Sequence, residues 1–307
     1  MKSLASRVIL VRPTGFGPDP ETAATNVFQR RVSDPDIRRK AEEEFDALLG
    51  ALDKCGIGTT VLDPVDPKAP NGVFPNNWFS TDASGNVLLY PMHNASRRTE
   101  RDPKLDAVLR REGFAVKELL DFSPWEEDGI YLEGTGSLVL DRAKRMAYAN
   151  LSPRTSEAAL DAWCTKMNYG SIGFNATVDG TLTGQPVYHT NVVLSIGEGF
   201  ALLGLEAMPY PGERNEVMEE LEKAGKEIIP FTVEQMHAFV GNALALRSLN
   251  DVPFIFLSES AFQALIPKQR IQLEQFGQLV PVVVPTIEAV GGGSVRCMLA
   301  ENFLPLL

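Results

Sequence analysis

Short apolar runs and amphipathic stretches alternate from one end of this chain to the other, and this pattern limits the choice of folds more than any other feature. The apolar runs are bounded by Gly, Pro, Asn and Asp, which is typical of buried strands. They cover residues 8–11, 59–62, 87–90, 137–140, 192–196, 200–205, 254–257 and 282–284. The stretches between them predict amphipathic helices. These cover residues 36–55, 103–112, 156–167, 215–224, 233–247 and 260–276. Because strands and helices mix throughout, the sequence predicts one α/β body.

No part of the chain has the composition of a linker or a low-complexity tract. A length of 307 residues is enough for one large hydrophobic core, so we predict a single domain over residues 1–307. We also find no readable internal repeat. Periodicity by itself therefore does not distinguish a doubly wound sheet from a barrel or a propeller.

Charge and cysteine content exclude several classes of protein. The formal net charge of −11 repels phosphate backbones and anionic lipid, so we expect neither nucleic acid nor membrane as a partner. The run Val8–Val11 is too short for a signal sequence, and no stretch reaches the roughly 18–20 apolar residues of a membrane span. Three cysteines, Cys55, Cys164 and Cys297, are too few for a disulfide framework. We expect a cytoplasmic protein with reduced thiols.

The segment "VGGGSVRCMLAENFLP" near the C-terminal end is the most informative motif. Three glycines, residues 291–293, allow positive φ and a close approach of the backbone to a ligand. Cys297 follows four residues later. A glycine-rich loop that delivers a thiol suits a nucleophilic site, whereas a turn followed by a buried structural cysteine explains the same letters.

His189 and Glu133 are the candidates for proton transfer and for its support. His189 stands in "PVYHTNVVLSIG", at the beginning of an apolar run, where loops build sites. Glu133 stands in "GIYLEGTGSLVLDR", and its candidate role is to orient the imidazole and stabilise its protonated form. A structural histidine and a solvated carboxylate are the alternatives for these positions.

Asparagines and arginines supply the candidate binding groups. Asn76 and Asn77 occur in "VFPNNWFST", where a turn also explains them. Guanidinium groups are bidentate clamps for a substrate carboxylate, although exposed helix ends account for the same residues. The candidates are Arg97, Arg98, Arg101 and Arg154.

The sequence offers no support for a metal or a nucleotide cofactor. His93, His189 and His237 are dispersed, and none lies in an HxxxH or HExxH spacing. There is no GxGxxG or GxxxxGK[ST] motif either. We therefore expect catalysis without metal or cofactor.

Several motifs in order resemble the guanidino-group-modifying enzyme superfamily, also called the pentein fold. They are "VRPTGF", "VFPNNWFS", "RRTE", "LEGTGSLVL", "YHTN", "FVGNALAL" and "GGGSVRCM", and together they span nearly the whole chain. Within the superfamily the sequence is similar to the arginine deiminase-related, citrulline-utilisation hydrolase branch, often labelled the amidinotransferase family. Each motif alone is weak, but the ordered set is specific.

The resemblance implies a five-bladed α/β propeller of pseudo-repeated ββαβ units with a cavity on its axis. It also implies roles. Cys297 attacks the guanidino or ureido carbon, His189 protonates the leaving nitrogen and then activates water, and Glu133 supports that chemistry. Arg98 and Arg154 fall where relatives such as dimethylarginine dimethylaminohydrolase clamp the substrate carboxylate, with Arg97 as a close competitor.

Two departures from the family pattern point to the substrate. Arginine deiminases carry aspartates where this chain has Asn77 and Asn191, and those carboxylates neutralise a guanidinium. An asparagine amide has one acceptor and one donor group without net charge, which suits a neutral ureido group. Dihydrolase members of the superfamily carry asparagine at this position and on an N-terminal loop, which Asn26 in "TAATNVFQ" matches.

We therefore expect a hydrolase that converts citrulline to ornithine, ammonia and carbon dioxide, or that takes arginine through both steps. A deiminase or dimethylargininase that stops at citrulline is the first rival, and an amidinotransferase is the second. A non-catalytic pentein that serves as a binding module is a rival from another class. The expected partner is a small amino acid of the citrulline or arginine type, and the sequence is also compatible with a homo-oligomer.

Overall fold

A computed structural model describes residues 3–307, which contain five three-stranded sheets. In each sheet the middle strand is antiparallel to one neighbour and parallel to the other. The sheets consist of β3 (Phe79–Thr81), β4 (Asn86–Leu89) and β5 (Glu118–Asp121); β6 (Val139–Asp141), β7 (Met146–Asn150) and β8 (Gly170–Phe174); β9 (Leu194–Ile196), β10 (Phe200–Leu203) and β11 (Glu227–Pro230); β12 (Leu244–Arg247), β13 (Pro253–Ser258) and β14 (Gln278–Val282); and β15 (Ala300–Glu301), β1 (Arg7–Val11) and β2 (Gly58–Leu62).

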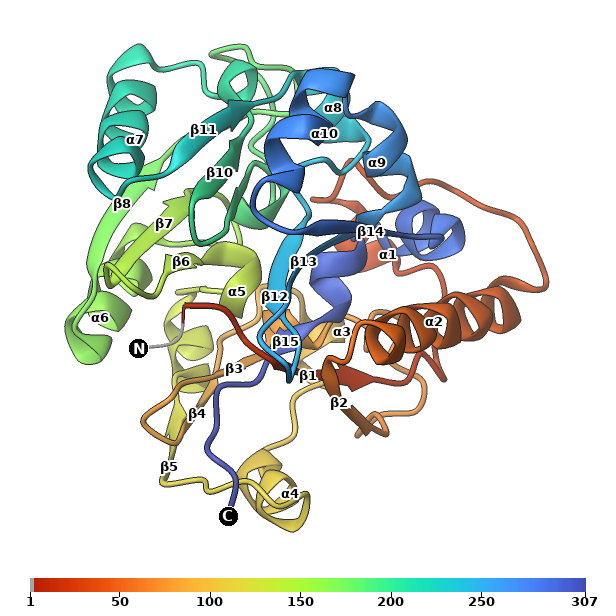
Figure 1. Ribbon diagram of the computed structural model, residues 1–307. Coiled ribbons are helices and arrows are strands. Elements are labelled where there is room, and N and C mark those ends of the chain that lie inside the picture. Colours follow the sequence, from red (N-terminus) through yellow and green to blue (C-terminus); the bar gives the residue numbers. More distant parts are fainter. Residues whose placement is uncertain (1–2) are drawn as a thin grey trace.

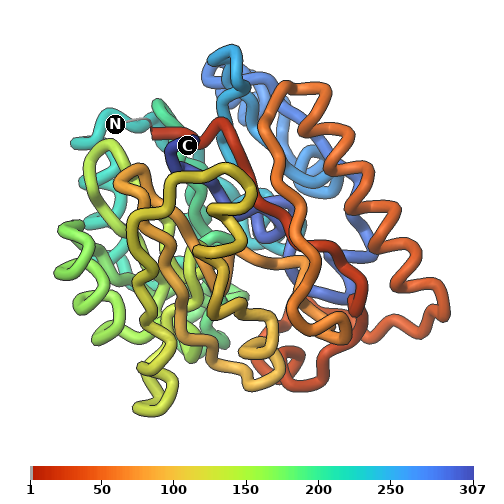
Figure 2. Tube along the Cα trace, turned by 90° about the horizontal axis from the view of Figure 1, so that it is seen from below, coloured from red at the N-terminus to blue at the C-terminus, as the bar shows by residue number. Residues whose placement is uncertain are grey.

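The same unit recurs five times: an antiparallel strand pair, a crossover that contains helix, and a third strand parallel to the second. In four units the strands follow one another along the chain. The fifth is assembled from both ends, because β15 pairs with β1 through Val8 and Glu301 and through Ile9 and Ala300. Figure 2 shows the red start and the blue end of the chain side by side. The repeat lies in strand pairing and has no recognisable counterpart in residue identity, which is why periodicity in the sequence did not reveal it.

The crossover helices lie on the outside of the molecule, around the sheets (Figure 1). They are α2 (Ile37–Lys54), α4 (Leu105–Arg111), α6 (Glu157–Met167), α7 (Pro211–Lys223), and the pair α9 (Glu259–Ala264) and α10 (Pro267–Glu274). α2 shows why they pack there. Its apolar residues recur every three or four positions, at Ile37, Ala41, Phe45, Leu48 and Leu52, and all are buried. One face of the helix is thereby held against the core and the charged face lies in solvent.

The first strand of each unit lies toward the centre of the molecule. β9 contacts both β6 and β12, and β15 contacts β3. Short helical segments connect one unit to the next, and they bring the chain back to this centre. They include α5 (Gly134–Ser137) and α8 (Val233–His237), together with the single turns η1 (Pro75–Asn77), η3 (Thr190–Val192) and η6 (Val295–Met298). Two more short helices, α1 (Pro20–Ala23) and α3 (Ala95–Arg98), lie within the crossovers β1–β2 and β4–β5.

Two predicted helices are wrong in extent. The helix predicted over 233–247 ends at His237, and residues 244–247 form strand β12. Phe239 has a φ of 62°, and a side chain at Gly241 would lie 2.1 Å from the carbonyl oxygen of Val192, so the chain turns tightly there. The helix predicted over 260–276 is two helices, because Pro267 starts a second one.

Two predicted strands are displaced. Residues 134–137 form the helical turn α5, so the strand predicted over 137–140 begins at Val139. The strand predicted over 282–284 is β14, which ends at Val282. The other predicted strands and helices coincide with observed elements to within a few residues. Within residues 3–307 no helix is both long enough and apolar enough to cross a membrane.

Candidate active site

The segments that precede the first strands of four units come together. The turns η1, α5, η3 and η6 contact one another, although they come from four different units. Asn77, Glu133, His189 and Cys297 belong to these turns or to the residues that cap them. With Asn242, they recur at intervals of roughly 55 residues, which is the length of one repeat. The fold thus gathers equivalent positions of successive units.

A small, narrow cavity lies where these turns meet. Cys297 and His189 both line it, so the sulfur and the imidazole share one small cavity. The remaining lining residues are Thr22, Asn26, Gln29, Asn71, Phe74, Asn77, Arg97, Arg154, Tyr188, Gly291 and Gly293.

The three cysteines are free thiols in different surroundings. Cys297 is 2% exposed, and its sulfur accepts hydrogen bonds from the Nδ2 groups of Asn242 at 3.2 Å and of Asn191 at 3.6 Å. Burial raises the pKa of Cys164 to about 11, and burial also raises the pKa of Cys55. Neither of these two thiols lines the cavity. A thiol placed for chemistry is therefore found at position 297.

His189 is bonded to Glu133 through one ring nitrogen and leaves the other one free for chemistry. Its Nε2 lies 2.7 Å from Oε2 of Glu133, while Nδ1 is buried and has no hydrogen-bond partner among the described residues. A Cβ atom at Gly136 would lie 2.7 Å from Nδ1 and 2.4 Å from Nδ2 of Asn77. Glycine at 136 thus keeps both polar atoms unobstructed, which explains one of the glycines of the "LEGTGS" motif.

The charges of this pair follow from its surroundings. Burial lowers the pKa of His189 to about 4, although the bond to Glu133 opposes the shift. Burial raises the pKa of Glu133, but Arg154 and His189 outweigh burial and bring it to about 2. The resting site therefore contains a neutral imidazole and a carboxylate, with Nε2–H as donor to Glu133 and Nδ1 as a free base.

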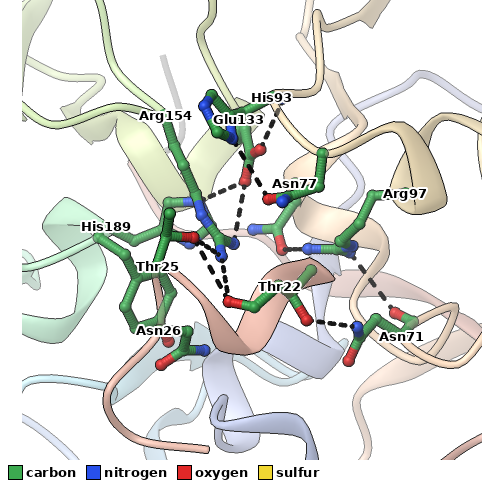
Figure 3. A network of polar contacts seen from close by, with 12 residues as sticks. Thr22, Thr25, Asn26, Asn71, Asn77, His93, Arg97, Glu133, Arg154 and His189 are labelled. Carbon is green, nitrogen blue, oxygen red and sulfur yellow. Dashed lines mark hydrogen bonds and ion pairs between the residues drawn. The ribbon is translucent and has the colours of Figure 1, made fainter. Parts of the chain in front are cut away.

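Glu133 and Arg154 are held in a buried polar network (Figure 3). Oε1 of Glu133 accepts a hydrogen bond from the backbone N–H of His93 at 3.0 Å. Nη1 of Arg154 lies 3.6 Å from the other carboxylate oxygen, Oε2. The Arg154 guanidinium also donates to Oγ1 of Thr25 at 2.8 Å and to the carbonyl of Thr22 at 3.3 Å. Its Nε is buried without a partner in the described chain. Arg154 thus retains unused donor capacity beside the cavity.

Arg97 and Arg98 are neighbours on α3 but face different surroundings. Arg97 is 3% exposed, lines the cavity, forms two bonds to the carboxylate of Glu100 and donates to Oδ1 of Asn77 at 2.8 Å. Burial lowers the pKa of its guanidinium, but Glu100 outweighs burial, so the net shift is upward. Arg98 donates to the carbonyls of Met92 and His93 and does not line the cavity.

The two asparagines of η1 have different surroundings. Oδ1 of Asn77 accepts from Arg97, whereas its Nδ2 is buried and has no partner in the described part of the chain. Both polar side-chain atoms of Asn76 are buried without partners among residues 3–307, and Asn76 does not line the cavity. Asn77 therefore offers a fixed N–H donor beside His189.

Asn26 lies in the N-terminal segment, which contributes Thr22, Asn26 and Gln29 to the lining of the cavity. Its Nδ2 donates to the carbonyl of Gly292 at 3.2 Å, and its Oδ1 accepts from the backbone N–H of Phe28 at 3.0 Å. Gly292 has a φ of 63°, and a Cβ there would lie 2.6 Å from Nδ2 of Asn26. The glycine-rich loop and the N-terminal segment are thus in direct contact.

Sequence reasoning missed Asn242, Tyr188 and Asn71 as residues of this site. Tyr188 donates to the carbonyl of Gly292 at 2.6 Å, and Asn71 lines the cavity. Asn242 belongs to the quoted motif "FVGNALAL", which is the signal that could have found it. Its role was hidden because we placed it inside a predicted helix. Within residues 3–307 no group of three or more His, Cys, Asp or Glu side chains is arranged to hold a metal ion.

Comparison with known families gives one match. The family described as N,N dimethylarginine dimethylhydrolase, eukaryotic, matches residues 12–304. No curated protein matches the sequence closely enough to count as a relative.

Solved structures share the fold. One is the N-terminal domain of ArgZ, an arginine dihydrolase from the ornithine-ammonia cycle in cyanobacteria, solved with substrate bound. Its sequence is 16% identical to this chain, the match covers 98% of this chain and 99% of the ArgZ domain, and the TM-score is 0.75. Full-length ArgZ is 14% identical with a TM-score of 0.73, and the match covers 98% of this chain but 41% of ArgZ. Dimethylarginine dimethylaminohydrolase, as an adduct with S-methyl-L-thiocitrulline, is 17% identical over 97% of this chain and 100% of its own, with a TM-score of 0.62.

Proposed function

Because the chain belongs to the pentein superfamily of guanidino-modifying enzymes, in the N,N dimethylarginine dimethylhydrolase family, we propose that it hydrolyses the ureido carbon of citrulline, or takes arginine through both steps to ornithine. In this proposal residues 1–307 form one catalytic domain, and the five three-stranded sheets are the blades of a pentein propeller.

The residues that line the cavity favour a substrate with a neutral ureido group. No Asp or Glu is among the residues that line it, all of which lie in the described chain. The buried carboxylates Glu133 and Glu100 stand behind the lining and are paired with His189, Arg154 and Arg97. A cationic guanidinium would therefore meet no free carboxylate. A neutral ureido oxygen can accept from the unpartnered Nδ2 of Asn77.

The arginines of the lining supply the other half of recognition. Arg154 and Arg97 both line the cavity, and Arg154 has a buried Nε without a partner among residues 3–307. We assign to Arg154 the binding of the substrate α-carboxylate, with Arg97 in support. Arg97 is already committed to Glu100 and Asn77, so its free donor capacity is smaller.

The proposed reaction begins with transfer of the Cys297 thiol proton to Nδ1 of His189, since that nitrogen is unprotonated at rest. The sulfur attacks the ureido carbon, and the imidazolium, stabilised by Glu133, returns its proton to the departing nitrogen. This leaves a thiocarbamate ester on sulfur. His189 then removes a proton from water, which cleaves the ester and regenerates the thiol. The carbamate released breaks down to amine and carbon dioxide.

The comparisons support this chemistry through the proteins they name. ArgZ is called an arginine dihydrolase, and its N-terminal domain has also been solved covalently bonded to a reaction intermediate. The family match instead favours a dimethylargininase that stops at citrulline. That activity is the second candidate, and amidino transfer is the third.

Product analysis separates these candidates. The purified protein would be incubated with arginine, citrulline, methylated arginines and agmatine, and ornithine and citrulline would be quantified by mass spectrometry. We expect ornithine from citrulline, and loss of all turnover in Cys297→Ser with retention in the control Cys55→Ser. Accumulation of citrulline from a methylated arginine, without ornithine, would favour the dimethylargininase. Turnover by Cys297→Ser would refute the proposed nucleophile.

A further inference from the structure

The sulfur of Cys297 has an unusual set of neighbours. Its hydrogen-bond donors in the described chain are two side-chain amides, Nδ2 of Asn242 at 3.2 Å and Nδ2 of Asn191 at 3.6 Å. All three residues are buried, and Asn191 and Asn242 are fully enclosed. A thiolate formed here could not be stabilised by bulk water, so fixed N–H donors would have to take the place of water.

The amide of Asn242 is fixed in orientation by its surroundings. Its Nδ2 also donates to the backbone carbonyl of Asn191 at 3.1 Å, and its backbone N–H donates to the carbonyl of Phe239 at 2.8 Å. Gly241 allows this turn to press against η3, because a side chain there would meet the carbonyl of Val192. One N–H of the amide therefore points at the Asn191 carbonyl and the other at the sulfur.

Other groups near the sulfur do not replace these donors at rest. His189, which lines the same cavity, is neutral because burial lowers its pKa to about 4, so no imidazolium is present to pair with a thiolate. Arg97 and Arg154 are ion-paired with Glu100 and Glu133, and neither donates a hydrogen bond to the sulfur. The titratable or charged groups on the segments around the sulfur include Tyr188, His189, Arg97, Arg154, Glu133, Glu288, Arg296 and Glu301.

We propose that Asn242, together with Asn191, stabilises the thiolate form of Cys297 by donating amide N–H groups to its sulfur. This inference rests on the proposed role of Cys297 as nucleophile, and it adds a residue from the fourth repeat to a site otherwise built from the other repeats. The donors also fix the sulfur's position, so that one face of it stays open to the cavity that Cys297 and His189 share.

Titration of the thiol tests this proposal without any substrate. Alkylation of Cys297 by iodoacetamide, which is neutral, would be followed between about pH 5.5 and 10 by mass spectrometry of the peptide that contains Cys297, and its rate reports the thiolate fraction. We expect Asn242→Ala to raise the thiol pKa by about one unit or more, which lowers the rate about tenfold at a fixed pH below the pKa. Asn242→Asp keeps the size of the side chain but brings a negative charge, so the rise should be larger.

Two further variants complete the experiment. Asn302→Ala is the matched control, because Asn302 is also a buried asparagine but is not bonded to the sulfur, and its titration should equal that of the wild type. Asn191→Ala should show a smaller rise, since its contact with the sulfur is longer. If Asn242→Ala does not fold, the near-isosteric Asn242→Asp decides the question.

An unchanged or lowered thiol pKa in a folded Asn242 variant would overturn the inference. This outcome is independent of the proposed reaction, because alkylation requires no turnover. A protein that hydrolyses no tested substrate but shows the expected titration would support the thiolate site while refuting the proposed function. Turnover of citrulline by a protein whose Asn242 variants show an unchanged titration would support the proposed function and refute the thiolate site.

Discussion

Nε2 of His189 lies 2.7 Å from Oε2 of Glu133, and both side chains are sealed from solvent. Because this contact occupies one ring nitrogen and the carboxylate fixes the tautomer, the unpartnered Nδ1 is the basic atom of the ring. In the proposed reaction this nitrogen is the base.

The first prediction concerns pH and stability. The folded-state pKa of His189, about 4, lies below its ordinary value of 6.5, so the unfolded chain binds more protons between these values. The stabilising contribution is complete above pH 6.5 and is lost as pH falls toward 4. The carboxyl of Glu133, with a pKa of about 2 against 4.5, extends the loss at lower pH. We expect Tm to fall across this window, and to fall less steeply in His189→Gln. An equal slope for both proteins would contradict the assignment.

The second prediction concerns Asn77. Asn77→Asp keeps the acceptor for Arg97 but removes the Nδ2 donor, so a ureido oxygen would face a lone pair. A mismatch of this kind costs about 1–3 kcal/mol, which corresponds to a roughly five- to 150-fold loss of kcat/KM with citrulline. Arginine consumption by the same variant is the internal control and should hold or rise. Equal losses for both substrates would indicate general damage to the site.

The third prediction uses two glycines. Gly136→Ala would place a methyl group 2.4 Å from Nδ2 of Asn77 and 2.7 Å from Nδ1 of His189. Displacement of these atoms by a fraction of an ångström or more should lower kcat by about a hundredfold. Gly50→Ala is the control, since Gly50 lies within α2 with no atom within 4 Å of the added methyl group. It should keep activity and stabilise the protein by about 0.5–1 kcal/mol. Full activity of Gly136→Ala would show that this close packing is not required.

The fourth prediction separates the arginines. Arg154→Lys loses the planar, multi-donor guanidinium at the cavity and should raise KM roughly tenfold or more. Arg98→Lys lies outside the cavity lining and should leave KM close to that of the wild type. Steady-state kinetics with citrulline measure both. A larger effect at 98 than at 154 would reverse the assignment of the carboxylate clamp.

Convergence of Cys297, His189 and Glu133 was anticipated from the sequence, because the ordered motifs resemble one superfamily over nearly the whole chain. The choice between Arg97 and Arg98 was not. Consecutive residues on a helix point about 100° apart, and both have the same chemistry. Only the packing of α3 places Arg97 against Glu100 and the cavity while Arg98 faces the carbonyls of Met92 and His93.

Asn242 illustrates the limit of local patterns. The apolar residues around it fit a helical period over 233–247, yet the chain turns at Phe239 and continues as β12. An apolar run of this length is compatible with a helix or with a buried strand, and only its pairing with β13 decides. Local periodicity therefore did not predict the position of Asn242 beside the sulfur, although the motif "FVGNALAL" contains this residue.

The sequence by itself determined the α/β class, most of the strands and crossover helices, and the residue types of the site, because these depend on local periodicity and on motifs carried by short segments. The tertiary structure alone decided the closure of β15 on β1, the contact that fixes the tautomer of His189 and the donors around Cys297. The physical reason is distance along the chain. These features arise from contacts between segments separated by one or more whole repeats, and no local preference of either segment specifies its partner.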